Sequence, residues 1–154
     1  MRVRPYSSGD WEQLCAIHDS ARKFELEAAG LGDAFLTLEQ TAENEGLFSG
    51  EVVVAEQNER IHGFAAHAEG ELTWLYVDPA SFRKGIGRLL LRHVVQSCNG
   101  CLSTEVLVGN AAALNLYFSE GFKIQRRIDG KLVGNESFAA SGYLLQYAAE
   151  KSVE

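Results

Sequence analysis

The stretch from residue 72 to residue 98 constrains the fold more than any other part of the chain. Leu72–Val77 is apolar, aromatic and β-branched, which predicts a strand. A seven-residue loop follows, and Gly85 and Gly87 then open a helix. The N-terminus of a helix presents unpaired N–H groups and a positive dipole end, and glycines let a bulky anion approach the backbone. The stretch therefore predicts an anion site at the junction of loop and helix. The apolar positions of this helix recur at helical spacing; they are Ile86, Leu89, Leu90, Val94, Val95 and Cys98.

Basic side chains surround these glycines in a chain that is acidic overall. The net charge is −7, from 14 Lys and Arg residues against 21 Asp and Glu residues. That balance argues against a nucleic-acid partner, which would need a basic surface. Around the glycines, Arg83, Lys84, Arg88 and Arg92 reverse the sign. The local reversal indicates a phosphate or pyrophosphate ligand.

Three other interpretations of the glycine segment compete with this one. A P-loop is excluded, because Arg88 stands where its lysine is required and its first glycine is missing. A dinucleotide-binding turn would need a third glycine at Leu90 and a shorter loop, although Glu105 lies 18 positions after Gly87, near the spacing of a ribose ligand. A glycine-rich turn whose basic residues simply face solvent stays open from this segment alone.

The chain as a whole predicts one domain over residues 1–154, because its length is typical of a single domain. The elements alternate as β-α-α-β-β-β-α-β-α-β-β, a mixed sheet with helices on both faces. Tight turns join three central strands into an antiparallel meander, and a helical crossover makes Leu102–Val108 parallel to Leu72–Val77. The other predicted strands are Arg2–Pro5, Val52–Ala55, Ile61–Ala68, Phe122–Ile128 and Gly142–Tyr147; the other helices begin after Asp10 and span Phe35–Glu45 and Ala111–Glu120.

Several classes of protein are disfavoured by what the sequence lacks. No apolar run reaches the ~18–20 residues of a membrane helix, and the N-terminal residues resemble no secretory signal, so we expect no membrane partner. Three cysteines, Cys15, Cys98 and Cys101, fit a reducing cytoplasm. Cys98 and Cys101 form a CxxC pattern, but no second pair lies at metal spacing. The pattern is therefore interpreted as a helix end, a glycine turn and a strand start, and no metal is expected.

Two motifs together carry a resemblance to a known family. The helix after the parallel strand fits the pattern Asn-x-x-Ala-x-x-x-Tyr-x-x-x-Gly-Phe at Asn110, Ala113, Tyr117, Gly121 and Phe122. The glycine loop, Phe82-Arg83-Lys84-Gly85-Ile86-Gly87, fits a (Gln/Arg)-x-x-Gly-x-(Gly/Ala) pattern except at its first position, where Phe82 replaces Gln or Arg. With this order and spacing, the chain resembles the GNAT superfamily of N-acetyltransferases across most of its length.

The resemblance implies a GNAT-like α/β (α+β) fold and acetyl-CoA as co-substrate. The sheet would be mixed and mostly antiparallel, and its parallel strands would splay apart to bind the cofactor. Pantetheine would then pair with the backbone near Leu75 and Val77, and loop amides would hold the pyrophosphate. Asn110 would contact the cofactor arm or cap its helix. The implied cofactor-binding residues are Leu75, Val77, Arg83, Lys84, Gly85, Ile86, Gly87, Arg88 and Asn110.

The chemistry requires a proton acceptor for the amine and a donor for the departing thiolate. The resemblance places Tyr117 near the thioester sulfur, and we expect it to be the general acid. Family members often carry a carboxylate on the strand before the loop, at the position that matches Thr73 in this chain. Glu71, two residues earlier on the same strand face, is therefore the candidate base. His67 on the preceding strand and a chain of water molecules are the alternatives.

The acceptor is expected to be a primary amine of a small molecule or a peptide. In the family its pocket is shaped by the first two helices and the closing strands, here roughly Phe24–Leu47 and Ile128–Tyr143. A non-catalytic CoA-binding module is the alternative function, and the departures at Phe82 and Thr73 keep it open. Unpaired sheet edges make a homodimer compatible with the fold.

Overall fold

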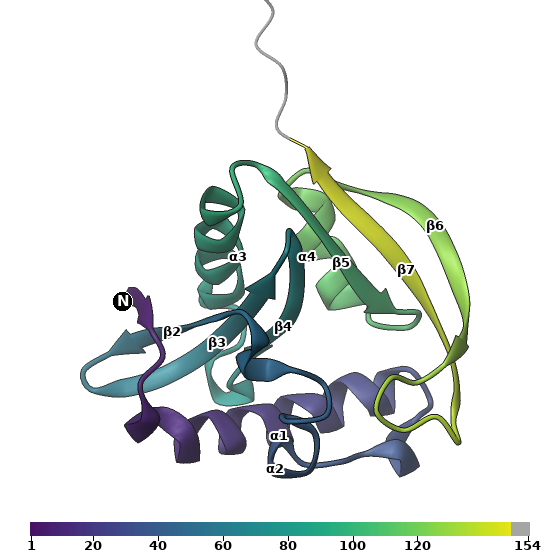
Figure 1. The fold of residues 1–154 in the computed structure, drawn as a ribbon, viewed down its shortest axis with the longest axis horizontal. Helices are drawn as coiled ribbons and strands as arrows, with labels where there is room; N and C mark the ends of the chain where they lie inside the picture. Colours follow the sequence, from purple (N-terminus) through teal and green to yellow (C-terminus); the bar gives the residue numbers. More distant parts are fainter. Residues whose placement is uncertain (149–154) are drawn as a thin grey trace, which may run out of the picture.

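A computed structural model describes residues 1–148, which form a seven-stranded sheet in the order β1-β2-β3-β4-β5-β7-β6 with flanking helices (Figure 1). The strands are β1 (Arg2–Pro5), β2 (Glu51–Gln57), β3 (Arg60–Ala68), β4 (Glu71–Val77), β5 (Cys101–Leu107), β6 (Phe122–Lys131) and β7 (Ala139–Ala148). The helices are α1 (Trp11–Ala28), α2 (Leu38–Thr41), α3 (Ile86–Ser97) and α4 (Ala111–Ser119), with 3-10 turns η1 (Ser8–Asp10), η2 (Gly32–Ala34), η3 (Leu47–Ser49) and η4 (Pro79–Ser81).

The predicted topology is confirmed. β2, β3 and β4 form the antiparallel meander, and β4 and β5 are parallel, joined by the crossover through α3. β1, β6 and β7 add antiparallel pairs at the two edges. No helix among residues 1–148 is long and apolar enough to cross a membrane.

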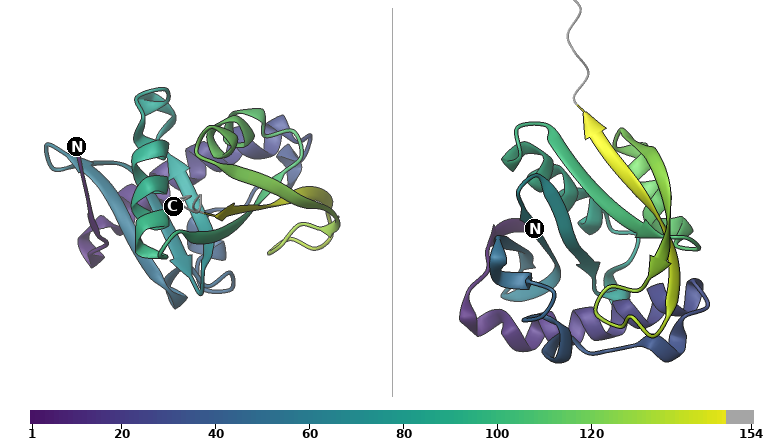
Figure 2. Two further views of the ribbon diagram at one scale, coloured as in Figure 1. Left: turned by 90° about the horizontal axis from the view of Figure 1, so that it is seen from above. Right: turned by 45° about the vertical axis from the view of Figure 1, so that its right-hand side comes forward.

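Two apolar clusters cover the two faces of the sheet. One cluster contains Leu90, Leu91 and Val94 of α3 together with residues of β5 and α4, and Figure 2 shows α3 and α4 on the same side of the sheet. The other cluster contains Leu14 of α1 and Leu38 of α2 against β2–β4. Helices on both faces were predicted, and the two clusters confirm it.

The second predicted helix, Phe35–Glu45, is wrong in extent. Only Leu38–Thr41 is α-helical. Thr37 begins this helix, because its hydroxyl accepts a hydrogen bond from Gln40 N–H. The chain then closes on itself, since Leu47 N–H donates to the Ala42 carbonyl and Gly46 adopts a left-handed conformation. This closure resembles the way in which helices end at a left-handed glycine, and it stops the helix one turn after it begins.

Candidate active site

The parallel strands β4 and β5 are paired only where they begin. Their register contains two pairs, Glu71 with Ser103 and Leu72 with Thr104, whereas β3 and β4 pair along six positions. Beyond Leu72 the two strands diverge (Figure 1). The edge of β4 that faces β5 is therefore unpaired along the rest of the strand, and its N–H and C=O groups are open to a ligand.

A β-bulge decides which backbone groups face this gap. Ala66 pairs with Trp74 and His67 pairs with Leu72, so Thr73 is an extra residue in β4. At the end of the strand, Asp78 N–H donates to the His62 carbonyl of β3 at 2.8 Å. Because successive residues point their backbone groups to opposite edges, the groups of Leu75 and Val77 point toward the gap. These are the two residues that the sequence predicted there.

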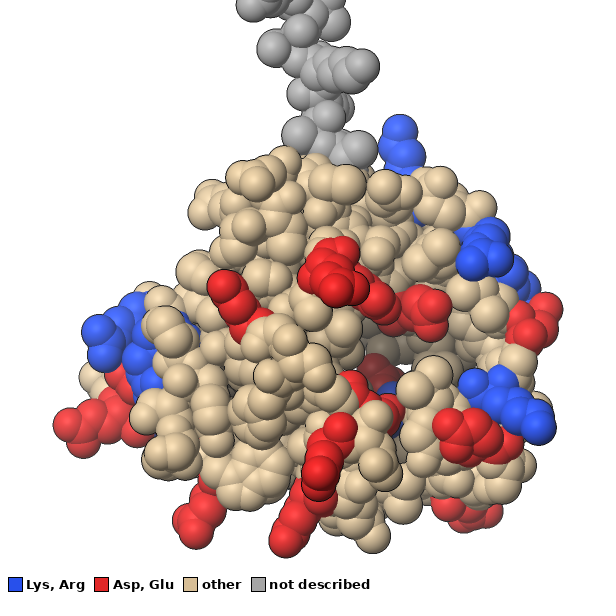
Figure 3. All heavy atoms as spheres, in the orientation of Figure 1, with Lys and Arg blue, Asp and Glu red and all other residues tan. Residues whose placement is uncertain are grey.

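A cavity of about 1390 Å³ extends from the start of α3, through the gap, to α1 and the β6–β7 turn. Figure 3 shows a hollow on one face of the molecule with acidic side chains around it. The cavity is lined by most of the predicted site residues: Glu71, Leu75, Val77, Arg83, Gly85, Ile86, Gly87, Arg88, Asn110 and Tyr117. Lys84 is exposed and is not part of the lining.

The start of α3 presents free backbone N–H groups to the cavity. The first helical hydrogen bond runs from Leu89 N–H to the Gly85 carbonyl, so the N–H groups of residues 85–88 precede it. Gly85 has a φ of +78°, a left-handed conformation that favours glycine. A Cβ at Gly87 would lie 3.3 Å from the Leu116 side chain. Both glycines thus serve the local geometry of the loop.

The positive charge of this region is smaller than the sequence suggests. Glu120 of the α4 C-terminus forms ion pairs with Arg88 at 2.5 Å and with Arg92 at 3.1 Å. Glu120 is 32 residues from Arg88, so no local pattern could have indicated this pairing. Arg83 lines the cavity, and among residues 1–148 no ion pair compensates its charge.

Phe82, the residue that departs from the family pattern, packs against α1. Its ring lies edge-to-face with Phe24, with 6.0 Å between ring centroids. Both rings are about half exposed, at 45% and 58%, and both line the cavity. An aromatic contact with α1 therefore occupies the position that holds a polar side chain elsewhere in the family.

Tyr117 lies where β4 and β5 part. It is 5% exposed and packs edge-to-face on Phe122, with 5.2 Å between centroids. Nearby, Thr104 Oγ1 donates to the Leu72 carbonyl at 3.1 Å. Burial raises the pKa of the Tyr117 hydroxyl, against a smaller opposite effect of Thr104. The phenol therefore stays protonated at neutral pH, as a proton donor must be.

Two carboxylates stand at the paired end of the gap. Glu71 pairs with Ser103, which lies two residues before Glu105, so both side chains project on the same side of the sheet and both line the cavity. Partial burial and then the charge of Glu105 raise the pKa of Glu71. From the sequence, Glu105 was considered only as a ribose ligand, because the register that places it beside Glu71 is fixed only in the folded sheet.

His67, the alternative base, lies outside the cavity lining. The residue is 7% exposed, and its Nδ1 is 3.6 Å from Cys98 Sγ at the C-terminus of α3. Its side chain therefore lies away from the gap between β4 and β5. Of the two side chains proposed as the base, only Glu71 reaches the cavity.

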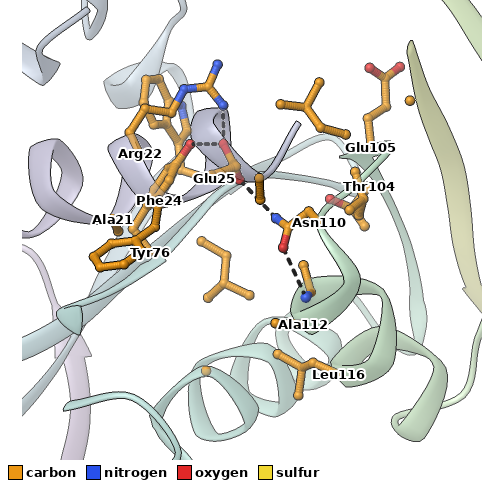
Figure 4. Close-up of a pocket in the computed structure, with 18 of the residues that line it drawn as sticks. Ala21, Arg22, Phe24, Glu25, Tyr76, Thr104, Glu105, Asn110, Ala112 and Leu116 are labelled. Carbon is orange, nitrogen blue, oxygen red and sulfur yellow. Dashed lines mark hydrogen bonds and ion pairs between the residues drawn. The ribbon is translucent and has the colours of Figure 1, made fainter. Parts of the chain in front are cut away.

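Glu25 of α1 was missed by sequence analysis and forms the centre of a polar network in the cavity (Figure 4). Its carboxylate accepts hydrogen bonds from Tyr76 OH at 3.2 Å and from Asn110 Nδ2 at 3.3 Å. It also forms an ion pair with Arg22, one helical turn earlier. Asn110 at the same time caps α4, because its Oδ1 accepts from Ala113 N–H at 3.2 Å. No motif surrounds Glu25 that could have indicated this role.

The two segments predicted to shape the acceptor pocket do come together. Asn135 of the β6–β7 turn donates to the Ala34 carbonyl at 3.0 Å. Leu132 packs with Leu26 and Ala34 in a small apolar cluster. Glu45 lines the same end of the cavity, where burial raises its pKa against the opposing charge of Arg22.

Residues 48–124, half of the chain, match the acetyltransferase (GNAT) domain family. The chain belongs to this family and is an acyltransferase of the N-acetyltransferase class. The matched residues run from the end of η3 through the cavity-lining strands and α3 to the first residues of β6.

Individual proteins that are similar to this chain in sequence or structure are also N-acetyltransferases. The peptidyl-lysine N-acetyltransferase YiaC of Escherichia coli is 36% identical over 72 residues, which span 46% of this chain and 49% of YiaC. The crystal structure of a ribosomal-protein-alanine N-acetyltransferase from Brucella melitensis is 26% identical and superimposes with a TM-score of 0.73, over 97% of this chain and 100% of that one. The PaiA N-acetyltransferase of Thermoplasma acidophilum, solved with coenzyme A, shares the fold at 18% identity and a TM-score of 0.71, over 96% and 98% of the two chains.

Proposed function

We propose that this protein transfers the acetyl group of acetyl-CoA directly to a primary amine. The observation that carries the proposal is the unpaired edge of β4, which leads from the free N–H groups of α3 to Tyr117. A pyrophosphate needs the free N–H groups at the start of α3, and an extended amide chain needs the unpaired strand edge. The fold shared with a protein solved with coenzyme A supports the same ligand.

The cofactor would be held mainly by the backbone. Leu75 and Val77 would pair with pantetheine as a neighbouring strand does, and the N–H groups of residues 85–88, with Arg83, would hold the pyrophosphate. We assign Asn110 to capping α4 rather than to contacting the cofactor, because both ends of its amide are already bonded. Lys84 would act only through its backbone and its charge.

The side chains at the paired end of the gap would supply the proton transfers. Glu71, whose pKa is raised, would take a proton from the incoming ammonium group, with Glu105 beside it. The amine nitrogen then forms a bond to the acetyl carbon. As the intermediate collapses, the carbon–sulfur bond breaks and the nitrogen releases its second proton to solvent. Tyr117 would protonate the departing thiolate, and backbone N–H groups near Val77 would stabilise the oxyanion.

The acceptor would be a primary amine of a peptide or a small molecule. The names of YiaC and of the Brucella enzyme specify protein substrates, which supports a peptide. The acidic lining beside the gap, with Glu25, Glu45, Glu71 and Glu105, favours a cationic amine. We further propose that residues 1–154 act as one domain in the cytoplasm, in keeping with three free cysteines, and that a homodimer is compatible with this function.

The test is a calorimetric titration with acetyl-CoA, with a nicotinamide dinucleotide as the control ligand. We expect saturable binding of acetyl-CoA alone, and thiol release only when an amine is added. A panel of lysine peptides, N-terminal alanine peptides and polyamines would then identify the acceptor. Binding without thiol release across the panel would instead support the non-catalytic CoA-binding module, and no binding would overturn the proposal.

A further inference from the structure

Glu25 connects the two sides of the gap between β4 and β5. On one side, it accepts a hydrogen bond from Tyr76 OH of β4 at 3.2 Å. On the other side, it accepts from Nδ2 of Asn110, which follows β5 and caps α4, at 3.3 Å. Figure 4 shows the carboxylate between these two groups. The contact with Asn110 joins residues 85 positions apart in the chain.

The carboxylate is fully engaged by these contacts. Oε1 accepts from Tyr76 OH and pairs with Arg22, and Oε2 accepts from Asn110. The Glu25 side chain is 22% exposed, and Tyr76 packs against the apolar cluster on the α1 face of the sheet. Hydrogen bonds to a charged acceptor are among the stronger ones in proteins. Glu25 is therefore built to hold its neighbours in place, and Glu71 remains the better placed proton acceptor.

We propose that Glu25 is a positioning residue that fixes the width of the cofactor gap, by tying β4 through Tyr76 to the start of α4 through Asn110. The width of the gap affects both cofactor binding by β4 and the position of the proposed general acid on α4. The β4 side carries the backbone groups of Leu75 and Val77, and α4 carries Tyr117 two turns after its start. This proposal rests on the proposed function for its kinetic consequence, while the bridge itself is a property of the free protein.

Exchanging the carboxylate of Glu25 with the amide of Asn110 tests the bridge. Glu25→Gln keeps the size but places an NH₂ group against a donor, either Arg22 or Asn110. Asn110→Asp keeps the cap of α4, since Asp caps helices as well as Asn does, but sets one carboxylate against another. In the double variant Glu25→Gln with Asn110→Asp, the new NH₂ group donates to the new carboxylate, and the Gln oxygen still accepts from Tyr76. The bridge is thereby rebuilt with its polarity reversed.

We expect each single variant to raise the KM and Kd for acetyl-CoA on the order of tenfold, as expected for one hydrogen bond to a charged group. The KM for the amine should change less, and the double variant should recover most of the loss. Glu27→Gln, which removes the same charge from an exposed position of α1, is the matched control and should bind as the wild type does. Losses that merely add in the double variant would overturn the proposal.

The unfolding midpoint separates this proposal from the proposed function. In the absence of ligand, the single variants should lower the midpoint and the double variant should restore it. If the wild-type protein binds no acetyl-CoA, the proposed function fails, and recovery of the midpoint in the double variant still supports the bridge. If the midpoint shows no recovery, the bridge is refuted whatever the protein binds.

Discussion

The two ends of the cavity are built in different ways. The cofactor end, where we propose that acetyl-CoA binds, comes mainly from one continuous stretch, Glu71–Arg88, and offers mainly backbone groups. The acceptor end is assembled from α1, the η2–η3 region and the β6–β7 turn, which are far apart in the chain and are joined by side-chain contacts such as Asn135 to Ala34. A site built on backbone groups should tolerate a side-chain change such as Phe82, whereas a site built on side chains should change its specificity with each substitution.

The two ends also differ in charge. At the cofactor end, the helix N-terminus and Arg83 attract an anion, while Glu120 neutralises much of the charge of Arg88 and Arg92. Outside Glu71–Arg88, the lining carboxylates Glu25, Glu45 and Glu105 outnumber the basic side chains Arg22 and Lys131. This arrangement would direct the anionic cofactor to one end of the cavity and the cationic amine to the other. Five substitutions test this contrast, in order of decreasing expected effect.

Gly87→Asp should affect the cofactor end most. Its carboxylate would stand among the N–H groups at the start of α3, and repulsion of about 4 kcal/mol between like charges at 4 Å corresponds to a roughly 1000-fold weaker binding of acetyl-CoA. An acidic residue in the first turn favours the helix itself, but its Cβ would lie 3.3 Å from the Leu116 side chain. The unfolding midpoint is therefore measured beside the affinity, and a midpoint equal to that of the wild type assigns the loss of binding to repulsion. Gly9→Asp, at an open position, is the control for calorimetry. Unchanged affinity of Gly87→Asp would place the pyrophosphate elsewhere.

Tyr117→Phe should lower kcat about 100-fold, as expected for the loss of a general acid, with little change in either KM. The ring still packs on Phe122, so the fold is kept. Tyr147→Phe, which removes a hydroxyl outside the cavity lining, should retain full activity in the same steady-state assay. Equal rates for wild type and Tyr117→Phe would refute the role as acid and leave the family assignment untouched.

Glu71→Gln should lower kcat/KM about 100-fold at neutral pH and remove the acidic limb of the pH profile. A base must be deprotonated, and the pKa of Glu71 is raised above its ordinary value of 4.5. Wild-type activity should therefore fall as the pH drops through that raised pKa. Glu105→Gln should lower the pKa of Glu71 and move the limb to lower pH. An unchanged profile in Glu71→Gln would assign the limb to another group.

Leu132→Ala should loosen the acceptor end alone. Leu132 is 6% exposed and packs with Leu26 and Ala34, so its truncation should cost about 2–3 kcal/mol of unfolding free energy. We expect the amine KM to rise several-fold, which corresponds to a loss of about 1 kcal/mol of amine binding energy. The affinity for acetyl-CoA should not change. Ile124→Ala, on an exposed position of β6, is the control. An equal loss at both ends would show that they are mechanically coupled.

Phe82→Gln should have the smallest effect. It installs the residue type usual in the family and removes one edge-to-face contact with Phe24, worth about 1 kcal/mol. Because the anion site depends on backbone N–H groups, the affinity for acetyl-CoA should change less than about threefold. Tenfold tighter binding would show instead that the polar side chain is a true ligand in this loop.

Much of the fold could be predicted because its signals are local. The antiparallel meander follows from short turns, the parallel partner from the helical crossover, and the cap of α4 from Asn110. The second helix could not be predicted in extent, since its end depends on Gly46 and the Leu47-to-Ala42 hydrogen bond rather than on composition. Most of the predicted cofactor residues line the cavity, because they belong to one short segment.

The glycine loop and the capped helix that carries Tyr117 could be recognised from the sequence alone, and with them the family. These features are encoded in neighbouring residues, whose backbone preferences act over a few positions. Three contacts arise only when the chain folds: Glu25 bridges the gap, Glu120 pairs with Arg88, and Glu105 lies beside Glu71. Each of these contacts joins residues at least 32 positions apart. Their geometry depends on strand register and helix packing, which no local pattern specifies.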